Sequence, residues 1–200
     1  PDNAVPEGAR LYLQYAQSKN VQEIEVNRQD GHFASVVRAA EGEDVLLVAE
    51  ADGIAFEAQV VFDADSETSP PDRLDTPVEL EEASNGEPFE IGDIQFATNS
   101  AEINRTSLLM LDLFAAYLLR NDAIGVHIKG HTDDRGRPED NQVLSENRAA
   151  RVAAALEQFG VPSNRITHAG FGQSAPVASN ATAEGRSQNR RTEFEIRLGH

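Results

Sequence analysis

The sequence predicts an α+β protein with two parts, an all-β sandwich over residues 1–85 and a mixed βαβαββ two-layer domain over residues 86–200. Short alternating segments without a helical period fill the first part, whereas two amphipathic helical patterns lie between alternating segments in the second. The charge also changes at the junction. Residues 1–85 hold 19 acidic and 5 basic side chains, a net of −14, and residues 86–200 hold 15 and 12, a net of −3.

The composition narrows the class of protein. No run of about 18 apolar residues occurs, so no segment is expected to span a membrane. Cysteine is absent, which excludes disulfides, zinc–thiolate sites and thiol catalysis. The formal net charge of −17 predicts a surface that repels nucleic acid and anionic lipid, so neither is expected as a partner.

The first part is predicted to hold six or seven short strands. Turn signals such as Asp30-Gly31 and Asp52-Gly53 separate them. Strands at this even spacing, with no helix between them, are typical of a small β-sandwich, and the many acidic residues fit a solvated face. The strand candidates are residues 10–15, 21–26, 33–38, 45–49, 54–62 and 77–80.

The second part follows a turn-rich linker at residues 84–88 and is predicted to form one mixed sheet covered on one face by helices. The first helix has Asn104 or Thr106 as its expected N-cap. The predicted elements are strands at 91–96, 124–128, 165–171 and 192–198, and helices at 108–119 and 144–159.

Arg148 is out of place in the second helical pattern. At about 100° per residue it projects between Leu144 and Val152, on the stripe that should face the core. A charge on an apolar stripe needs a partner, and the nearest candidates are Asp133 and Asp134 in the preceding turn. The pair is either a structural ion pair or the two halves of a receptor for a ligand that carries an ammonium and a carboxylate.

Several ordered motifs of the second part resemble the OmpA-like domain, a family that includes the periplasmic parts of peptidoglycan-associated lipoprotein and of the stator protein MotB. The resemblance spans residues 88–198. It implies a place in the periplasm, at the outer membrane and cell wall of a Gram-negative bacterium. The motifs are Ile94-Gln95-Phe96, Asn99-Ser100-Ala101-Glu102-Ile103, Gly130-His131-Thr132-Asp133, Asn141, Leu144-Ser145, Arg148-Ala149 and the segments 170–180 and 184–191.

The OmpA-like resemblance implies non-covalent binding of peptidoglycan through the diaminopimelate of its stem peptide. Such binding would anchor a larger envelope protein or outer-membrane complex to the cell wall. The family's Asp falls on Asp133, which would receive the ligand ammonium, and its Arg falls on Arg148, which would receive the carboxylate. The other pocket positions that the resemblance implies are Thr132, Asn141 and Leu144, with Asn99 and Ser100 in a loop that contributes partly through its backbone.

The first part carries a second resemblance. Asp30-Gly31-His32-Phe33 and the later segment 45–53 resemble the carboxypeptidase-regulatory-like, or transthyretin-like, β-sandwich repeat. This resemblance implies a spacer or a protein-binding surface without catalysis. We therefore expect envelope proteins as possible partners of the acidic sandwich.

Two other interpretations stay open. Asp140 stands where the family commonly has Tyr, which favours an assembly module of an envelope or secretion complex that kept the fold without the ligand. A metal-dependent hydrolase would use His131, Asp133 and Asp134, but no third ligand is clearly placed, so we expect no enzyme activity, metal or cofactor. The segment 185–191 resembles a basic anion-binding turn, and we expect it mainly to brace the fold.

Overall fold

Residues 5–51, 55–66, 78, 86, 88–89, 91, 94–97 and 100–198 are described by a computed structural model. The chain divides into two units, Pro1–Glu82 and Ala83–His200. The described residues of the first unit contain strands without helices, and those of the second contain strands and three α-helices. The fold class is therefore α+β, as predicted.

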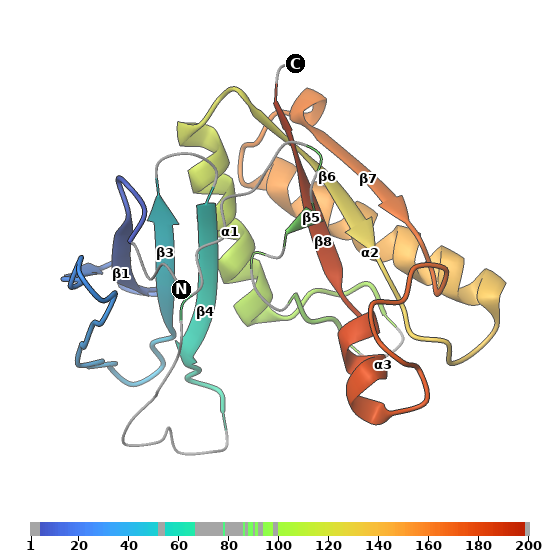
Figure 1. The fold of residues 1–200 in the computed structure, drawn as a ribbon, viewed down its shortest axis with the longest axis horizontal. Helices are drawn as coiled ribbons and strands as arrows, with labels where there is room; N and C mark the ends of the chain where they lie inside the picture. Colours follow the sequence, from blue (N-terminus) through green and yellow to red (C-terminus); the bar gives the residue numbers. More distant parts are fainter. Residues whose placement is uncertain are drawn as a thin grey trace. The chain divides into compact units, whose positions relative to one another are not determined.

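The first unit is built around one four-stranded antiparallel sheet with the order β2-β1-β3-β4 (Figure 1). Its register places Leu13 of β1 opposite Leu47 of β3, and Leu11 opposite Ile24 of β2. The strands are β1 (Arg10–Tyr15), β2 (Val21–Ile24), β3 (Val45–Ala51) and β4 (Ala55–Phe62).

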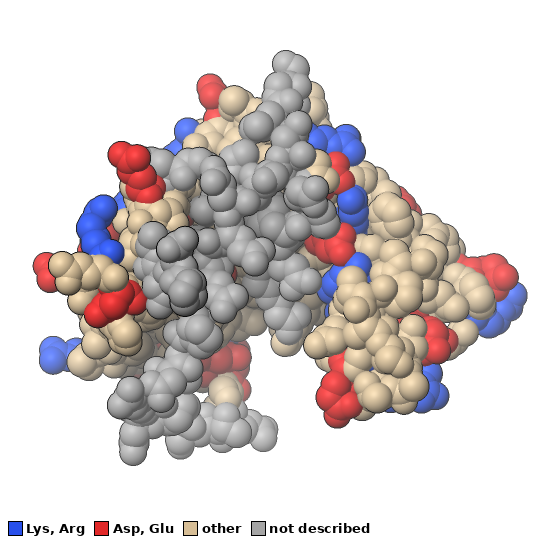
Figure 2. Space-filling view, in the orientation of Figure 1, with Lys and Arg blue, Asp and Glu red and all other residues tan. Residues whose placement is uncertain are grey.

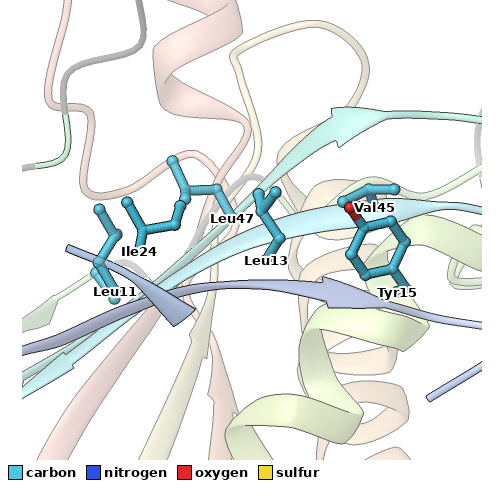
Figure 3. Packing of buried hydrophobic residues seen from close by; sticks show 7 residues of the cluster. Leu11, Leu13, Tyr15, Ile24, Val45 and Leu47 are labelled. Atoms are coloured by element: carbon cyan, nitrogen blue, oxygen red, sulfur yellow. The ribbon is translucent and has the colours of Figure 1, made fainter. Parts of the chain in front are cut away.

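One face of this sheet carries an apolar cluster (Figure 3). Side chains that alternate along β1 and β3 meet on this face, because successive side chains of a strand point to opposite faces. Burying them removes apolar surface from water, at about 25 cal/mol for each Å². The buried members are Leu11, Leu13, Tyr15, Ile24, Val45, Leu47 and Ala49.

The predicted strand at 33–38 is wrong. Of this segment only Phe33 forms an isolated bridge, with Val26. Phe33 and Val37 instead pack their side chains against the cluster, so the apolar pattern reports burial without backbone pairing. Most of the predicted strand at 77–80 lies outside the described residues. The described residues show one sheet in this unit, and the two-sheet sandwich stays a prediction.

The second unit holds a mixed sheet with the order β5-β8-β6-β7 (Figure 1). Strand β6 pairs in parallel with β7 and antiparallel with β8, so helix α2 makes the crossover that a parallel pair requires. The elements are β5 (Pro88–Phe89), α1 (Arg105–Arg120), β6 (Ile124–Gly130), α2 (Pro138–Gln158), a 3₁₀ turn at Ser163–Arg165, β7 (Ile166–Gly170), α3 (Ala183–Asn189) and β8 (Thr192–Leu198).

The core of the second unit lies between this sheet and helices α1 and α2, which lie on one side of it (Figure 1). The rings of Phe114 in α1 and Phe194 in β8 meet edge to face, with centroids 5.4 Å apart. Asn104 caps α1 by accepting a hydrogen bond from the Ser107 N–H at 2.8 Å, which confirms the first of the two expected N-caps. Ile128, Leu111 and Leu156 are also fully buried.

Two elements of the second unit differ from the prediction. The first strand was expected around Ile91, Ile94 and Phe96, but β5 is Pro88–Phe89, and Phe96 makes only an isolated bridge with Ile103. The expected turn at 185–191 instead overlaps the short helix α3, which begins at Ala183 and ends at Asn189. Both segments are too short to establish a hydrophobic period of their own.

Candidate functional site

The site residues follow the end of β6, where three separate segments are tied together by backbone hydrogen bonds. The His131 N–H donates to the Arg191 carbonyl at 3.0 Å, and the Thr132 N–H donates to the Gly172 carbonyl at 2.9 Å. The Phe171 N–H donates to the Gly130 carbonyl at 2.9 Å. The loops after β6 and β7 and the start of β8 are thereby held side by side.

Two glycines at the strand ends bring helix α2 into direct contact with the sheet. Gly130 and Gly170 are partners in the β6–β7 register. A Cβ at Gly130 would lie 2.3 Å from the Ser145 carbonyl oxygen, and one at Gly170 would lie 2.3 Å from the Glu146 nitrogen. Any other residue would push the helix away. Because these two positions have no side chain, α2 can pack directly against the ends of β6 and β7. This contact fixes the distance between α2, which carries Arg148, and the strand that leads to Asp133.

Asp133 is buried, and both of its carboxylate oxygens accept hydrogen bonds. Oδ1 accepts from the backbone N–H of Arg135 at 3.0 Å, and Oδ2 accepts from Nη1 of Arg190 at 2.8 Å. Burial acts to raise the pKa of Asp133, but the hydrogen bonds from Arg190 and Arg135 outweigh it and hold the pKa below its usual value. Asp133 is therefore an anion at neutral pH, whereas its neighbour Asp134 is exposed.

Arg148 is half-buried, and its guanidinium has different partners from those predicted. Nε donates to the Ser100 carbonyl at 2.9 Å, and the guanidinium lies 4.8 Å from the centre of the Phe96 ring. Burial and the positive charge of Arg190 lower the pKa of Arg148, while the charge of Asp133 opposes them. A guanidinium stays charged under such shifts.

Asp133 and Arg148 form no ion pair with each other, so the alternative of a structural pair between them is wrong. Among the described residues, the ion-pair partner of Asp133 is Arg190, and Arg148 has no carboxylate within ion-pair distance. The two opposite charges are close enough to influence each other, yet each keeps its own partners. This arrangement leaves a carboxylate and a guanidinium as two separate groups of one site.

Thr132 and Asn141, which the sequence predicted as pocket residues, are both buried and support the loop that carries Asp133. Thr132 Oγ1 donates to the Asp133 carbonyl at 2.9 Å. Asn141 Nδ2 donates to the carbonyls of Asp133 and Arg135, at 3.2 and 3.0 Å, and to Oε1 of Gln173 at 2.8 Å. The amide group of Asn141 therefore joins the loop after β6 to the loop after β7.

The remaining predicted positions are only partly brought to the site. Ser100 contributes its backbone carbonyl to Arg148, in keeping with a loop that acts through its backbone. Leu144 is half-buried on α2. Asn99 lies outside the described residues. Asp140 is exposed in the first turn of α2, where a negative charge complements the helix dipole.

His131 does not belong to a metal site with Asp133 and Asp134. Its ring is buried against the Phe171 ring, and Nε2 lies 3.5 Å from Oε2 of Glu193, which is long for a hydrogen bond. The neighbouring side chains of His131 and Arg191 lower the pKa of Glu193 to about 2, although burial of Glu193 acts to raise it. Among the described residues, no three His, Asp or Glu side chains gather closely enough to hold a metal ion.

Arg190 was not among the predicted site residues, because the segment 185–191 was expected mainly to brace the fold. That expectation does describe Asn189, which is fully buried and whose Oδ1 accepts from the N–H groups of Val177 and Ala178. The next residue, Arg190, reaches Asp133 instead. The strand register explains this contact: Thr192 pairs with Gly130, so residues just before Thr192 lie beside those just after Gly130. The sequence alone carries no signal of that register.

Comparison with known proteins identifies the second unit. The family model described as "OmpA family" matches residues 95–190. Outer membrane porin F of Pseudomonas aeruginosa is 37% identical over 105 residues, which cover 52% of this chain and 30% of the porin. The outer-membrane lipoprotein YfiB of the same species is 43% identical over 98 residues, covering 49% of this chain and 58% of that protein. The peptidoglycan-associated lipoprotein of Rhizobium meliloti is 38% identical over 102 residues, covering 50% and 58%.

The chain thus spans less than two thirds of each of these relatives. Among solved structures, the peptidoglycan-associated lipoprotein of Burkholderia pseudomallei is 28% identical, with 52% of this chain and 89% of that chain covered and a TM-score of 0.49. Within the described residues, none of the helices combines the length and the apolar character that a membrane crossing needs. From the family match, the ordered motifs and the strand and helix order, residues 95–190 of this chain are a domain of the OmpA family.

Proposed function

We propose that the second unit binds peptidoglycan non-covalently through the diaminopimelate of the stem peptide and so anchors a larger envelope protein to the cell wall, without catalysis. The observation that carries the proposal is the separation of Asp133 from Arg148. The free end of diaminopimelate carries an ammonium and a carboxylate. An anionic Asp133 and a cationic Arg148 that are not paired with each other provide the complementary charges.

Asp133 keeps capacity for an ammonium. A carboxylate offers about four acceptor positions. Its described hydrogen bonds, from the Arg135 N–H and from Arg190, occupy two of them. The lowered pKa keeps the group ionised, so a ligand ammonium would meet a charged acceptor.

Arg148 keeps capacity for a carboxylate. A guanidinium has about five N–H donors in a planar fork, and the described residues use one of them, from Nε to the Ser100 carbonyl. That hydrogen bond and the contact with the Phe96 ring orient the fork, so less conformational freedom is lost when a ligand binds.

The relatives support a place in the cell envelope. Their names describe an outer membrane porin, an outer-membrane lipoprotein and a lipoprotein associated with peptidoglycan. We extend this to the present chain as a location in the periplasm at the outer membrane and cell wall. The first unit, with its net charge of −14 through Asn85, would then face envelope proteins rather than the wall, since peptidoglycan also carries carboxylates.

The expected affinity is modest for one site. A few charge-assisted hydrogen bonds in a small pocket correspond to micromolar binding, about −8 kcal/mol. Peptidoglycan presents many identical stems on one network. A protein with several such sites would therefore be held far longer than one site allows.

Co-sedimentation with purified sacculi tests the proposal. The wild-type protein should pellet with diaminopimelate-type sacculi and much less with lysine-type sacculi, whose stems lack the second carboxylate. Asp133→Asn and Arg148→Gln should each weaken pelleting by about tenfold or more, because each removes a charge-assisted hydrogen bond. The matched controls are Asp134→Asn and Arg151→Gln, which change exposed neighbours of the same types. Equal pelleting of all five proteins would reject the site.

The second candidate function is a protein–protein assembly module that keeps the fold but binds no ligand. The ion pair between Asp133 and Arg190 favours the assembly module, because Asp133 already has a partner within the protein and needs no ligand to balance its charge. Calorimetry with meso-diaminopimelate separates the two candidates. Heat that saturates and disappears in Asp133→Asn supports the receptor, and no heat at millimolar ligand supports the assembly module.

A further inference from the structure

The contact between Arg190 and Asp133 joins an exposed side chain to a buried one. The Arg190 side chain is 47% exposed, whereas the Asp133 side chain is 12% exposed. Oδ1 of Asp133 is held by the backbone N–H of Arg135, and Oδ2 is held by Nη1 of Arg190. One oxygen therefore has a fixed partner, and the other has a partner that solvent can reach.

Arg190 is also weakly held. Within the described part of the chain, its guanidinium makes a single hydrogen bond, the one to Asp133. Arg165 provides the contrast, since it is buried and donates to the carbonyls of Ile124, Leu118 and Asn121. An arginine with one partner and about half of its side chain in water can leave without breaking another contact within the described part of the chain, provided that another cation takes its place on the buried carboxylate.

We propose that Arg190 is the resident cation of Asp133 and that the ligand ammonium takes its place, so that binding is an exchange of one cation for another. This inference rests on the proposed function and adds a competitor inside the site. The geometry supports it because Arg190 uses the oxygen of Asp133 that the backbone leaves free.

The charges around Asp133 favour departure of Arg190 over coexistence. Arg190 and Arg186 act electrostatically on Asp133, and Arg190 also acts on Arg148. A ligand ammonium that arrived while Arg190 stayed would add another cation to this group. Departure of Arg190 into solvent removes that repulsion and also relieves Arg148, on which its charge acts.

The exchange is tested by asking whether one substitution, Arg190→Gln, strengthens or weakens the binding of two ligands. Calorimetry or NMR titration would measure the binding of meso-diaminopimelate and of pimelate, which has both carboxylates but no ammonium. Arg190→Gln removes the competitor, so the variant should bind meso-diaminopimelate about threefold to tenfold more tightly than the wild type. It should bind pimelate no more tightly, because without an ammonium there is nothing to exchange.

Two control variants accompany this test. Arg190→Lys keeps a cation and should stay close to the wild type. Arg137→Gln removes an exposed charge on the loop that carries Asp133, where Arg137 has an ion-pair contact with Glu139. It should not favour diaminopimelate over pimelate.

The other possible results of these titrations overturn either the exchange alone or the proposed function as well. Weaker or unchanged binding of diaminopimelate by Arg190→Gln overturns the exchange and leaves the proposed function standing. A gain for both probes also overturns it, because the effect would then be general. If neither the wild type nor any variant binds diaminopimelate, the proposed function fails and the exchange fails with it.

Discussion

The arginines near the two ends of strand β6 differ in burial and in the number of their hydrogen-bond partners. Beside its first residue, Ile124, the buried Arg165 donates from Nε and Nη2 to carbonyls at the end of α1 and at the start of the strand. Beyond its last residue, Gly130, the guanidinium groups of Arg148 and Arg190 each make one hydrogen bond to described residues and are partly open to solvent. An arginine that donates to several carbonyls of the chain holds the fold, whereas one with a single partner keeps donors for a ligand.

The largest expected effect is on the buried arginine. Arg165→Leu removes the hydrogen bonds from a buried guanidinium to three carbonyls, so the free energy of unfolding should fall by about 3 kcal/mol. Urea denaturation measures this. Arg165→Lys, which keeps the charge but loses the planar fork, should recover only part of the loss. If Arg165→Leu were as stable as the wild type, the contrast between the arginines at the two ends of β6 would be rejected.

Gly170→Ala tests the contact that connects the strand ends to α2. The new methyl group would lie 2.3 Å from the Glu146 nitrogen and 2.6 Å from Ser145 Oγ, so the helix must shift. We expect a loss of about 1–3 kcal/mol in the free energy of unfolding, typical of overpacking. Because α2 carries Arg148, ligand binding should weaken in the protein that remains folded. Calorimetry at a temperature where the variant is folded separates the two effects.

The contribution of Glu193 to stability is expected to be intermediate in size and to depend on pH. Its pKa is about 2 in the folded protein against an ordinary value of 4.5, because His131 and Arg191 favour the carboxylate. This stabilisation is fully present above pH 4.5 and is lost as the pH falls towards 2. Solvent screening limits it to about 1 kcal/mol. In Glu193→Gln, unfolding free energy measured against pH should therefore decline less steeply over this acid range.

The smallest effect on stability is expected for the partly open arginine. Arg148→Gln removes one hydrogen bond to a carbonyl and the contact with the Phe96 ring, so unfolding should change by about 1 kcal/mol or less. Binding to sacculi should nevertheless weaken by about tenfold or more. If thermal melting showed a loss comparable to that of Arg165→Leu, Arg148 would belong with the structural arginines.

Regular periods made much of the fold predictable. The strand at 10–15 has its predicted bounds, and the alternation of Ile124, Val126 and Ile128 correctly indicated β6. Helix α2 begins at Pro138, earlier than its apolar period, because proline fits the first turn of a helix and needs no N–H there. The strand expected at 33–38 failed because its apolar side chains reach the core while its backbone stays unpaired.

The site was predictable only in part. The misplaced charge of Arg148 indicated that this position mattered, and the family resemblance chose Asp133 over Asp134, in line with the burial of the first and the exposure of the second. The role of Arg190 could not be read from periodicity, because its approach to Asp133 depends on the pairing of β8 with β6, far away in the sequence. Figure 2 illustrates a related difficulty: both signs of charge occur over the second unit on the face shown, so no single-sign patch marks a site.

The close contact of Gly130 and Gly170 with α2 has a consequence for how the domain tolerates sequence change. The spacing between the strand ends and the helix is set there largely by backbone atoms, which every amino acid shares. Core side chains such as Val152 or Leu156 could then be exchanged for others of similar volume at some cost in stability, while the distance between the two charged groups of the site stays the same. Such a domain can diverge widely in its interior and still keep the two charged groups of the proposed site in one geometry.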